Sequence, residues 1–336
     1  MSDTPGAIGQ PDAPRYFQPG SVLVLGGTGF VGRSLGEALV AHAGGGGLRI
    51  VVPSRRPQRA QDLRMLPGVE LPLADIHDDA TLARLVAGRD AVVNLVGILH
   101  GNDQAFQRAH VELPRRLVRA CRAAGVRRIV HVSALGAAGD APSRYLRTKA
   151  GGEAVLRAPA LDITVLRPSV MFGEGDRFLN LFAGLQRVFP LLPLAGAGAR
   201  FQPVWVENVV QAIVRCLGDR QTIDATYECA GPTVYTLAEL VRMAGAWSGH
   251  PRPILPLPSA IGRLQALLME WLPGEPLMSR DNLDSMRIAR VASGVLPDLT
   301  ALGIHPASID SVMAPLLGRS SGPARLEPLR RHAGRG

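Results

Sequence analysis

Two residues able to do acid–base chemistry stand four positions apart near the middle of the chain. Tyr145 and Lys149 would share one face of an α-helix, so the ammonium group can lie near the phenol and lower its pKa from about 10. Such a phenol can exchange a proton with a carbonyl or alcohol oxygen whose carbon gains or loses hydride. Ser133, at the end of an apolar run, can hydrogen-bond the same oxygen. We expect Ser133, Tyr145 and Lys149 to be catalytic, the alternative for the pair being an ordinary amphipathic helix.

A glycine-rich turn near the start of the chain predicts what supplies the hydride. The β-favouring run 21–25 leads into three spaced glycines, and a stretch with apolar residues at helical spacing follows. Such a strand–turn–helix unit lets the backbone approach a pyrophosphate and directs helix N–H groups toward it. We expect a nicotinamide dinucleotide here, the alternative being a plain turn. The residues assigned to it are Gly26, Thr28, Gly29, Phe30, Val31 and Gly32.

The end of the second predicted strand distinguishes between the two nicotinamide dinucleotides. Ser54, Arg55 and Arg56 follow the apolar run 48–52, and residues 38–61 contain no Asp or Glu. An acidic residue at this position binds the ribose 2′-hydroxyl of NAD, whereas an arginine accommodates the 2′-phosphate of NADP. We therefore predict that NADP(H) is preferred, with NAD(H) as the alternative. The two arginines could also be ordinary loop charges.

Three later strand ends add expected cofactor contacts. Asp75 is expected either to accept a hydrogen bond from the adenine amino group or to cap the helix that follows. Gly97 lets the backbone pass close to the cofactor ribose, or forms a simple turn. Pro168 fixes the turn after the sixth strand and brings the next residues near the nicotinamide amide. The other residues assigned from these turns are Ile76, Val96 and Ser169.

The order of apolar runs predicts an α/β fold with a doubly wound parallel sheet, the Rossmann arrangement. Short runs rich in Val and Ile alternate with helical stretches, which is typical of strands covered on both faces. The predicted strands are 22–25, 48–52, 69–74, 91–96, 128–132 and 163–167, and the predicted helices include 33–43, 80–87 and 104–124. The expected organisation is a flexible N-terminus over 1–19, a dinucleotide-binding domain over 20–170 with elements returning at about 200–232, a smaller substrate or partner region over 171–320, and a disordered basic tail over 321–336.

Composition and charge narrow the function classes. The chain has 336 residues, of which 46% are hydrophobic and 19% charged, as in soluble globular proteins. Its net charge of +9 comes mostly from single scattered arginines, so we expect no nucleic-acid partner. Widely spaced cysteines and scattered histidines predict neither a disulfide framework nor a metal site. No signal peptide and no apolar run of ~18 residues is present, which predicts a cytoplasmic protein.

Two apolar stretches in the second half have more than one interpretation. Residues 181–199 are rich in Pro and Gly and could form a lid, line a pocket or pack in the core, and we favour packing. From Ile261 to Trp271, apolar residues recur at helical spacing. This helix either packs in the core of the smaller region, which we favour, or docks on a partner or on the inner face of the cell membrane.

With these motifs in place, the chain resembles the extended and atypical branch of the short-chain dehydrogenase/reductase superfamily. The glycine turn, the strand-end Ser133 and the pair Tyr145 and Lys149 carry this resemblance. Within that branch it is most similar to the nucleotide-binding accessory subunit of mitochondrial respiratory complex I and its bacterial relatives. The motifs that carry the closer similarity are 26–33, 94–99, 132–136, 143–149, 167–173 and 175–180, and it extends from about residue 20 to about residue 318.

The resemblance implies a role for each matching position. It implies that the glycines 26, 29 and 32 form the pyrophosphate turn, that Arg55 and Arg56 occupy the 2′-phosphate position, and that Asp75 contacts adenine. It likewise implies that Ser133, Tyr145 and Lys149 are the catalytic set. The proton-relay Asn of ordinary members has no counterpart in residues 104–124. The complex I relatives are held to bind NADPH without turning it over, so an intact pair does not establish catalysis.

Three functional classes follow. The first, which we place ahead, is an NADP(H)-dependent oxidoreductase or epimerase acting on an apolar carbonyl or quinone-like small molecule, with Tyr145 as acid or base and Lys149 as ribose anchor. The second is a catalytically quiet NADP(H)-binding subunit of a respiratory or ubiquinone-synthesising complex. The third is a sugar-nucleotide epimerase or dehydratase. An enzyme of that class would be expected to hold NAD with an acidic residue, so the arginine pair and the apolar second half argue against it.

Overall fold

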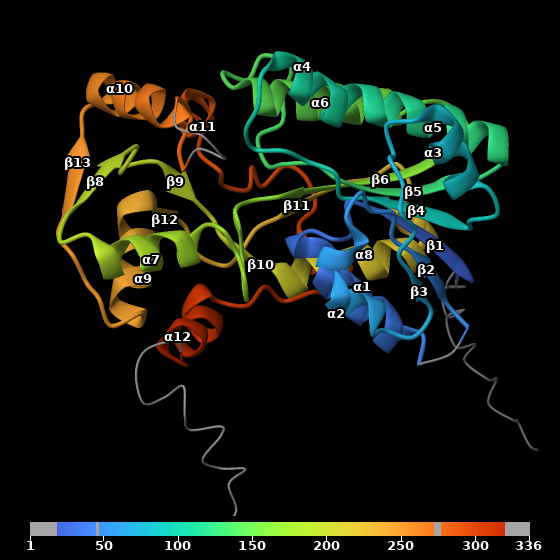
Figure 1. Ribbon diagram of the computed structural model, residues 1–336, viewed down its shortest axis with the longest axis horizontal. Helices are drawn as coiled ribbons and strands as arrows, with labels where there is room; N and C mark the ends of the chain where they lie inside the picture. The colour runs from blue at the N-terminus through green and yellow to red at the C-terminus, as the bar shows by residue number, and fades with distance from the viewer. Residues whose placement is uncertain (1–18, 45–46, 272–276, 320–336) are drawn as a thin grey trace, which may run out of the picture.

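The computed structural model describes residues 19–44, 47–271 and 277–319. The chain forms two lobes, one built on a large sheet and a smaller one rich in helices (Figure 1). The flexible N-terminus expected over residues 1–19 lies, apart from Pro19, outside the described residues, and so does the disordered tail expected over residues 321–336.

The larger lobe contains a seven-stranded sheet in the order β11-β6-β5-β4-β1-β2-β3, in which every pair of neighbours is parallel. The strand order reverses between β1 and β4, which opens a crevice at the carboxyl ends of these two strands. The predicted doubly wound fold is thus confirmed. The strands are β1 (Ser21–Leu25), β2 (Arg49–Val51), β3 (Val69–Glu70), β4 (Ala91–Asn94), β5 (Arg128–Val132), β6 (Asp162–Pro168) and β11 (Thr226–Cys229).

Helices cover both faces of this sheet (Figure 1). One face packs against α1 (Phe30–His42), α2 (Gln61–Arg64) and α8 (Val206–Gly218), and the other against α3 (Asp79–Val86), α5 (Leu113–Ala124) and α6 (Arg144–Leu156). Alternate strand residues point to opposite faces, so Val130 belongs to the first hydrophobic cluster and Ile129 to the second. Both side chains are fully buried, which stabilises the sheet through the hydrophobic effect.

The segment predicted as one helix over 104–124 is interrupted. It consists of α4 (Asp103–Gln107), a π-helical turn η2 (Arg108–Glu112) and α5. The backbone of η2 lies directly against α6, since a Cβ added to Gly152 would come within 2.1 Å of the carbonyl oxygen of His110. Only glycine permits this approach. Single π turns occur frequently at functional sites.

Two predicted strands are shorter than expected. The strand predicted over 69–74 ends at Glu70 and continues only as a single bridge between Ser54 and Leu73. The strand predicted over 91–96 ends at Asn94, because the Asn94 side chain accepts a hydrogen bond from the N–H of Val96 and turns the chain.

The smaller lobe has its own hydrophobic core. Its helices are α7 (Leu179–Val188), α9 (Leu237–Trp247), α10 (Ser259–Glu270), α11 (Arg280–Ser285) and α12 (Ile309–Arg319), and its strands are β7 (Met171–Phe172), β8 (Leu192–Ala195), β9 (Arg200–Phe201), β10 (Val204–Trp205), β12 (Tyr235–Thr236) and β13 (Ile254–Leu257). Phe182, Leu192 and Leu194 are buried in this core. Part of the stretch 181–199 therefore packs, as favoured from the sequence, whereas Val188, Phe189 and Leu191 are exposed.

Helix α10 does not bury its large apolar side chains in the core of the smaller lobe, as the sequence analysis had favoured. Ile261, Leu264, Leu268 and Trp271 are 53, 57, 57 and 79% exposed, so the prediction that they pack in the core is wrong. The buried side of the helix carries small residues instead, and the Cβ of a residue at Gly262 would lie 2.7 Å from that of Ala195 in β8. Small residues let α10 approach the lobe closely, which turns its large side chains outward.

We predict that Gly152→Ala lowers the free energy of unfolding by about 1–3 kcal/mol, because its methyl group must push α6 away from the backbone of η2. The matched control is Gly184→Ala in the exposed part of α7, where no atom lies within 4 Å of the added Cβ. That change should stabilise the helix by about 0.5–1 kcal/mol. Urea unfolding followed by circular dichroism measures both. Equal effects of the two changes would show that the contact is not tight.

Candidate active site

At the crevice between β1 and β4, the predicted glycine turn and Lys149 both lie next to residues 95–97. A Cβ at Gly26 would lie 3.1 Å from the backbone nitrogen of Val96. The Nζ of Lys149 lies 3.4 Å from the carbonyl oxygen of Val96, and a Cβ at Gly97 would lie 3.2 Å from this Nζ. The turn after β1 and the lysine of α6 therefore flank residues 95–97 from two sides.

The glycine turn has the properties that a pyrophosphate requires. Gly26 has a φ of +77°, and a Cβ at Gly32 would come within 2.1 Å of the carbonyl oxygen of Gly27. Helix α1 starts after Gly29 with no side-chain cap and no acidic residue in its first turn. Its first N–H groups and its positive dipole end therefore remain available to an anion. These residues fit the expected dinucleotide.

The other predicted turn residues lie around this helix start. Thr28 and Val31 are half-buried, and the ring of Phe30 reaches toward Gly173, where an added Cβ would lie 3.5 Å from its Cζ. The contact joins the turn to the segment after β7. The glycine turn of the larger lobe and the segment after β7 of the smaller lobe thus lie side by side at the crevice.

Arg55 and Arg56 are both exposed at the end of β2, beside the short helix η1 (Pro57–Arg59). Ser54 accepts a hydrogen bond from the N–H of Arg56, which shapes this loop. Arg33 in the first turns of α1 also reaches the loop, since it donates to the carbonyl oxygen of Arg59. We did not assign Arg33 from the sequence, although its place directly after Gly32 was a usable signal.

Asp75 does not cap the helix that follows it, so that alternative is wrong. It is exposed, and its carboxylate accepts a hydrogen bond from the N–H of His77. Helix α3 is capped by Asp78, whose side chain accepts from the N–H of Thr81. The neighbour of Asp75, Ile76, packs against the second hydrophobic cluster. The carboxylate of Asp75 is therefore exposed on the surface.

Lys149 is buried among backbone carbonyl groups. Its Nζ donates to the carbonyl oxygen of Val132 at 3.0 Å and more weakly to that of Val96. Burial lowers the pKa of Lys149 to about 8, and the nearby Glu153 carboxylate opposes this shift. An ammonium group has three N–H donors, so one remains for a ribose hydroxyl.

Tyr145 differs from the expectation that its neighbour would lower its pKa. Burial raises the pKa of the Tyr145 phenol, and the positive charge that opposes the shift comes from Arg290 rather than from Lys149. Spacing along a helix face places the two side chains on one side but does not report desolvation. At neutral pH the phenol is therefore protonated.

The hydroxyl of Ser133 points to a carboxylate that the sequence analysis missed. It donates to Glu153 Oε1 at 2.5 Å, and Arg167 holds both oxygens of the same carboxylate at 3.0 and 2.6 Å. Glu153 is 1% exposed. Tyr145, Lys149 and Glu153 recur every four residues on one face of α6, which was a readable signal.

His110, on the π turn, is a second residue that the sequence analysis missed. Its Nε2 accepts from the N–H of Ile98, so Nδ1 carries the proton and donates to Thr148 Oγ1 at 2.9 Å. Burial, with a smaller effect of Lys149, lowers the pKa of His110 to about 3. The ring is neutral and packs edge-on against Tyr145, with centroids 5.6 Å apart. His110 thus positions the tyrosine ring.

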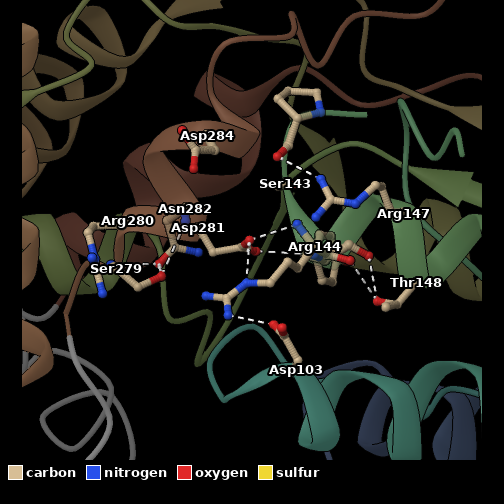
Figure 2. A network of polar contacts seen from close by, with 12 residues as sticks. Asp103, Ser143, Arg144, Arg147, Thr148, Ser279, Arg280, Asp281, Asn282 and Asp284 are labelled. Atoms are coloured by element: carbon tan, nitrogen blue, oxygen red, sulfur yellow. Dashed lines mark hydrogen bonds and ion pairs between the residues drawn. The ribbon is translucent and has the colours of Figure 1, made fainter. Parts of the chain in front are cut away.

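The smaller lobe reaches the site through two further side chains. Asp281 of α11 accepts hydrogen bonds from the N–H groups of Arg144 and Tyr145, at 2.7 and 3.1 Å, and so caps α6 together with Ser143 (Figure 2). Arg290 is buried and donates to the carbonyl oxygen of Leu135. Both lie more than 130 positions after Tyr145, so no local pattern could have linked them to it.

Pro168 and Ser169 end β6 next to the same region. The carbonyl oxygen of Pro168 accepts from the N–H of Leu135, and the hydroxyl of Ser169 donates to the carbonyl oxygen of Arg290 at 2.9 Å. The turn is therefore rigidly attached to the smaller lobe. The side chain of Ser169 is satisfied within the protein.

The described residues contain no group of three or more His, Cys, Asp or Glu side chains that could hold a metal ion. Cys121, Cys216 and Cys229 are buried and unpaired, and burial raises the pKa of each thiol.

The chain is similar in sequence to NAD(P)H-binding proteins of known families. The profile of an NAD(P)H-binding family matches residues 26–178. The mouse protein NADH dehydrogenase (ubiquinone) 1 alpha subcomplex subunit 9, mitochondrial, is 32% identical over 297 residues, which cover 85% of this chain and 77% of that protein. The ceramide reductase of Caulobacter vibrioides is 32% identical over 197 residues, or 58% of this chain and 60% of that protein.

Among solved structures, the dTDP-glucose 4,6-dehydratase DesIV of Streptomyces venezuelae, with NAD bound, matches with a TM-score of 0.69. The match covers 90% of this chain and 99% of that one, at 21% identity. At this level of identity the similarity concerns the fold, which agrees with the seven-stranded parallel sheet.

We predict that Glu153→Ala lowers the free energy of unfolding by about 3 kcal/mol, because it leaves the Arg167 guanidinium without its buried partner. Glu153→Gln keeps the volume and should cost less. The control is Glu70→Ala, which breaks an exposed ion pair with Arg49 and should change little. Chemical denaturation of the three variants measures the differences. A loss no larger for Glu153→Ala than for Glu70→Ala would contradict the role of this carboxylate.

Proposed function

We propose that this protein uses NADPH to reduce a carbonyl group of an apolar substrate. The chain belongs to the family of the NADH dehydrogenase (ubiquinone) 1 alpha subcomplex subunit 9, which is an NAD(P)H-binding branch of the short-chain dehydrogenase/reductase superfamily. The observation that carries this proposal is the meeting of the glycine turn and Lys149 at residues 95–97, with Tyr145 one turn away on the same helix face. Nicotinamide and phenol would then face the same substrate carbon and oxygen.

Each residue has a distinct task in this reaction. The glycine turn and the start of α1 hold the pyrophosphate, and Lys149 offers its remaining N–H to the ribose. A dinucleotide bound there would supply the hydride for the carbonyl carbon. Tyr145 gives its phenolic proton to the carbonyl oxygen, since it is the phenol next to Lys149 on the same helix face. The Ser133 proton is held by Glu153, which leaves Tyr145 as the proton donor.

The proposed substrate class is an apolar carbonyl compound. The ceramide reductase among the relatives bears a name that denotes a lipid substrate, and a quinone is a second apolar carbonyl compound. The fold neighbours named as sugar-nucleotide enzymes share only about a fifth of their residues with this chain. We therefore place a lipid ketone or a quinone ahead of a sugar nucleotide.

A second candidate function is a catalytically quiet NADP(H)-binding subunit of a respiratory or ubiquinone-synthesising complex. The observation in its favour is that the mouse relative, which covers most of this chain, is named as a subunit of NADH dehydrogenase (ubiquinone). In this function the buried dinucleotide would stabilise the fold rather than react. The two functions require the same binding site and differ in turnover.

We predict that the purified protein oxidises NADPH in the presence of micellar long-chain ketolipids or ubiquinone analogues, which is measured as loss of nicotinamide absorbance. Tyr145→Phe should lower kcat at least 100-fold with little change in NADPH affinity, because it removes the proton donor alone. The control is Tyr227→Phe, which removes a phenol on the other face of the sheet and should leave turnover unchanged. Tight NADPH binding without turnover of any substrate would instead support the quiet subunit.

We further predict that Arg55→Ala with Arg56→Ala weakens NADPH binding by about 10–100-fold and leaves NADH binding unchanged, since the loss of one charge-assisted hydrogen bond to the 2′-phosphate costs about 1.5–3 kcal/mol. Fluorescence titration with both dinucleotides measures this. Arg84→Ala, an exposed arginine of α3, is the control and should change neither affinity. An equal loss for NADPH and NADH, or no loss, would show that these arginines do not select NADPH.

A further inference from the structure

Helix α10 presents its apolar side to solvent. Ile261, Leu264, Leu268 and Trp271 lie at spacings of three and four along the helix and form one exposed stripe, the α10 stripe. A helix that stabilises a core would turn these side chains inward. Here Gly262 and Ala266 occupy the inner side, with Ala266 fully buried. The outward orientation is built into the packing and is not a frayed end.

A hollow lined by arginines lies along one flank of this stripe. Arg144, Arg147, Arg263 and Arg280 surround about 360 Å³ of space between the start of α6, α10 and α11, together with Asp281 and Asp284. Figure 2 labels five of these residues, Arg144, Arg147, Arg280, Asp281 and Asp284. By the 100° rotation per residue of a helix, Arg263 lies between the α10 stripe and the buried side. We name this hollow the arginine pocket.

The carboxylates of the arginine pocket are already engaged within the protein. Asp281 accepts from the backbone of α6, and Asp284 pairs with Arg263 at 2.9 Å. Arg147 donates to the carbonyl oxygens of Ala141 and Pro142, which carry no full charge. Arg144 also pairs with Asp103, and Arg280 pairs with Glu270. Among these four arginines, Arg147 is therefore the one that pairs with no carboxylate of the described residues, and its charge can meet a phosphate.

We propose that the α10 stripe and the arginine pocket together seat the protein on the surface of an anionic phospholipid bilayer. An exposed apolar helix face flanked by arginines is the pattern of a helix that lies in the membrane interface. Trp271 at the end of the helix matches the headgroup level, and Arg147, which pairs with no described carboxylate, meets a lipid phosphate. The net charge of +9 favours approach to a negative surface. In the described part of the chain, no helix is long and apolar enough to cross a membrane.

The proposed surface is connected to the active site by short links. The ion pairs Arg263–Asp284 and Arg280–Glu270 fasten α11 to α10, and Asp281 of α11 caps the helix that carries Tyr145. Helix α11 is therefore the single element that connects α10, with its exposed stripe, to the start of α6, where Tyr145 lies. The inference holds whether Tyr145 is catalytic or the protein only binds the dinucleotide.

The test is co-sedimentation of the full chain with vesicles of phosphatidylcholine alone or with 30% phosphatidylglycerol. We expect binding to the anionic vesicles, weakened about tenfold by Leu264→Glu with Leu268→Glu, and also weakened by Arg147→Gln with Arg263→Gln. Because the two leucines are exposed, their replacement should leave the circular dichroism spectrum unchanged. The matched control is Met65→Glu with Val295→Glu, which adds the same charge at residues 84 and 86% exposed elsewhere and should weaken binding much less.

Three outcomes would overturn the proposal. The first is no binding to anionic vesicles at low salt. The second is binding that salt abolishes but that the leucine variant and the control reduce equally, which indicates charge attraction alone. The third is absence of vesicle binding together with a dimer, seen by analytical ultracentrifugation, that Leu264→Glu with Leu268→Glu dissociates. In that case the α10 stripe would seat a second copy of the chain.

Discussion

The buried carboxylate of Glu153 joins the three elements on which the site is built. A charge removed from water is tolerated only where opposite charge and hydrogen bonds compensate it. Arg167 of β6 and Ser133 of β5 provide that compensation, and they thereby fix the rotation of α6 about its own axis. Tyr145 and Lys149 lie on the same face of this helix, so their positions follow from the same contacts. Asp281 fixes the other end of α6 from the smaller lobe.

Much of the larger lobe could be predicted from the sequence, because its information is local. The strands β1, β5 and β6 are rich in Val, Ile and Leu, and the turn after β1 contains glycines that the backbone geometry itself requires. The positions of Tyr145 and Lys149 on one helix face also follow from spacing alone. What spacing could not give is the environment, and burial, which raises the pKa of Tyr145, contradicted the direction that we expected.

The residues that were missed are those whose position depends on distant or irregular structure. His110 enters the site because of a π turn, which propensities along the chain do not reveal. Arg290 and Asp281 belong to a segment more than 130 residues after Tyr145 in the sequence. The orientation of α10 was misjudged because an apolar period of 3.6 is the same for a helix facing a core and for one facing outward. Gly262 and Ala266, opposite the large residues, were the deciding signal.

The π turn also affects how this chain aligns with its relatives. A π turn has one residue more than the α-helical turn it replaces, so the side chains of α4 and α5 are out of phase by about 100°. A relative with one residue fewer between Phe106 and Pro114 could continue as a regular helix and would then direct a different side chain toward Thr148. A single-residue gap in an alignment of this segment would thus separate chains with an imidazole beside the tyrosine from chains without one.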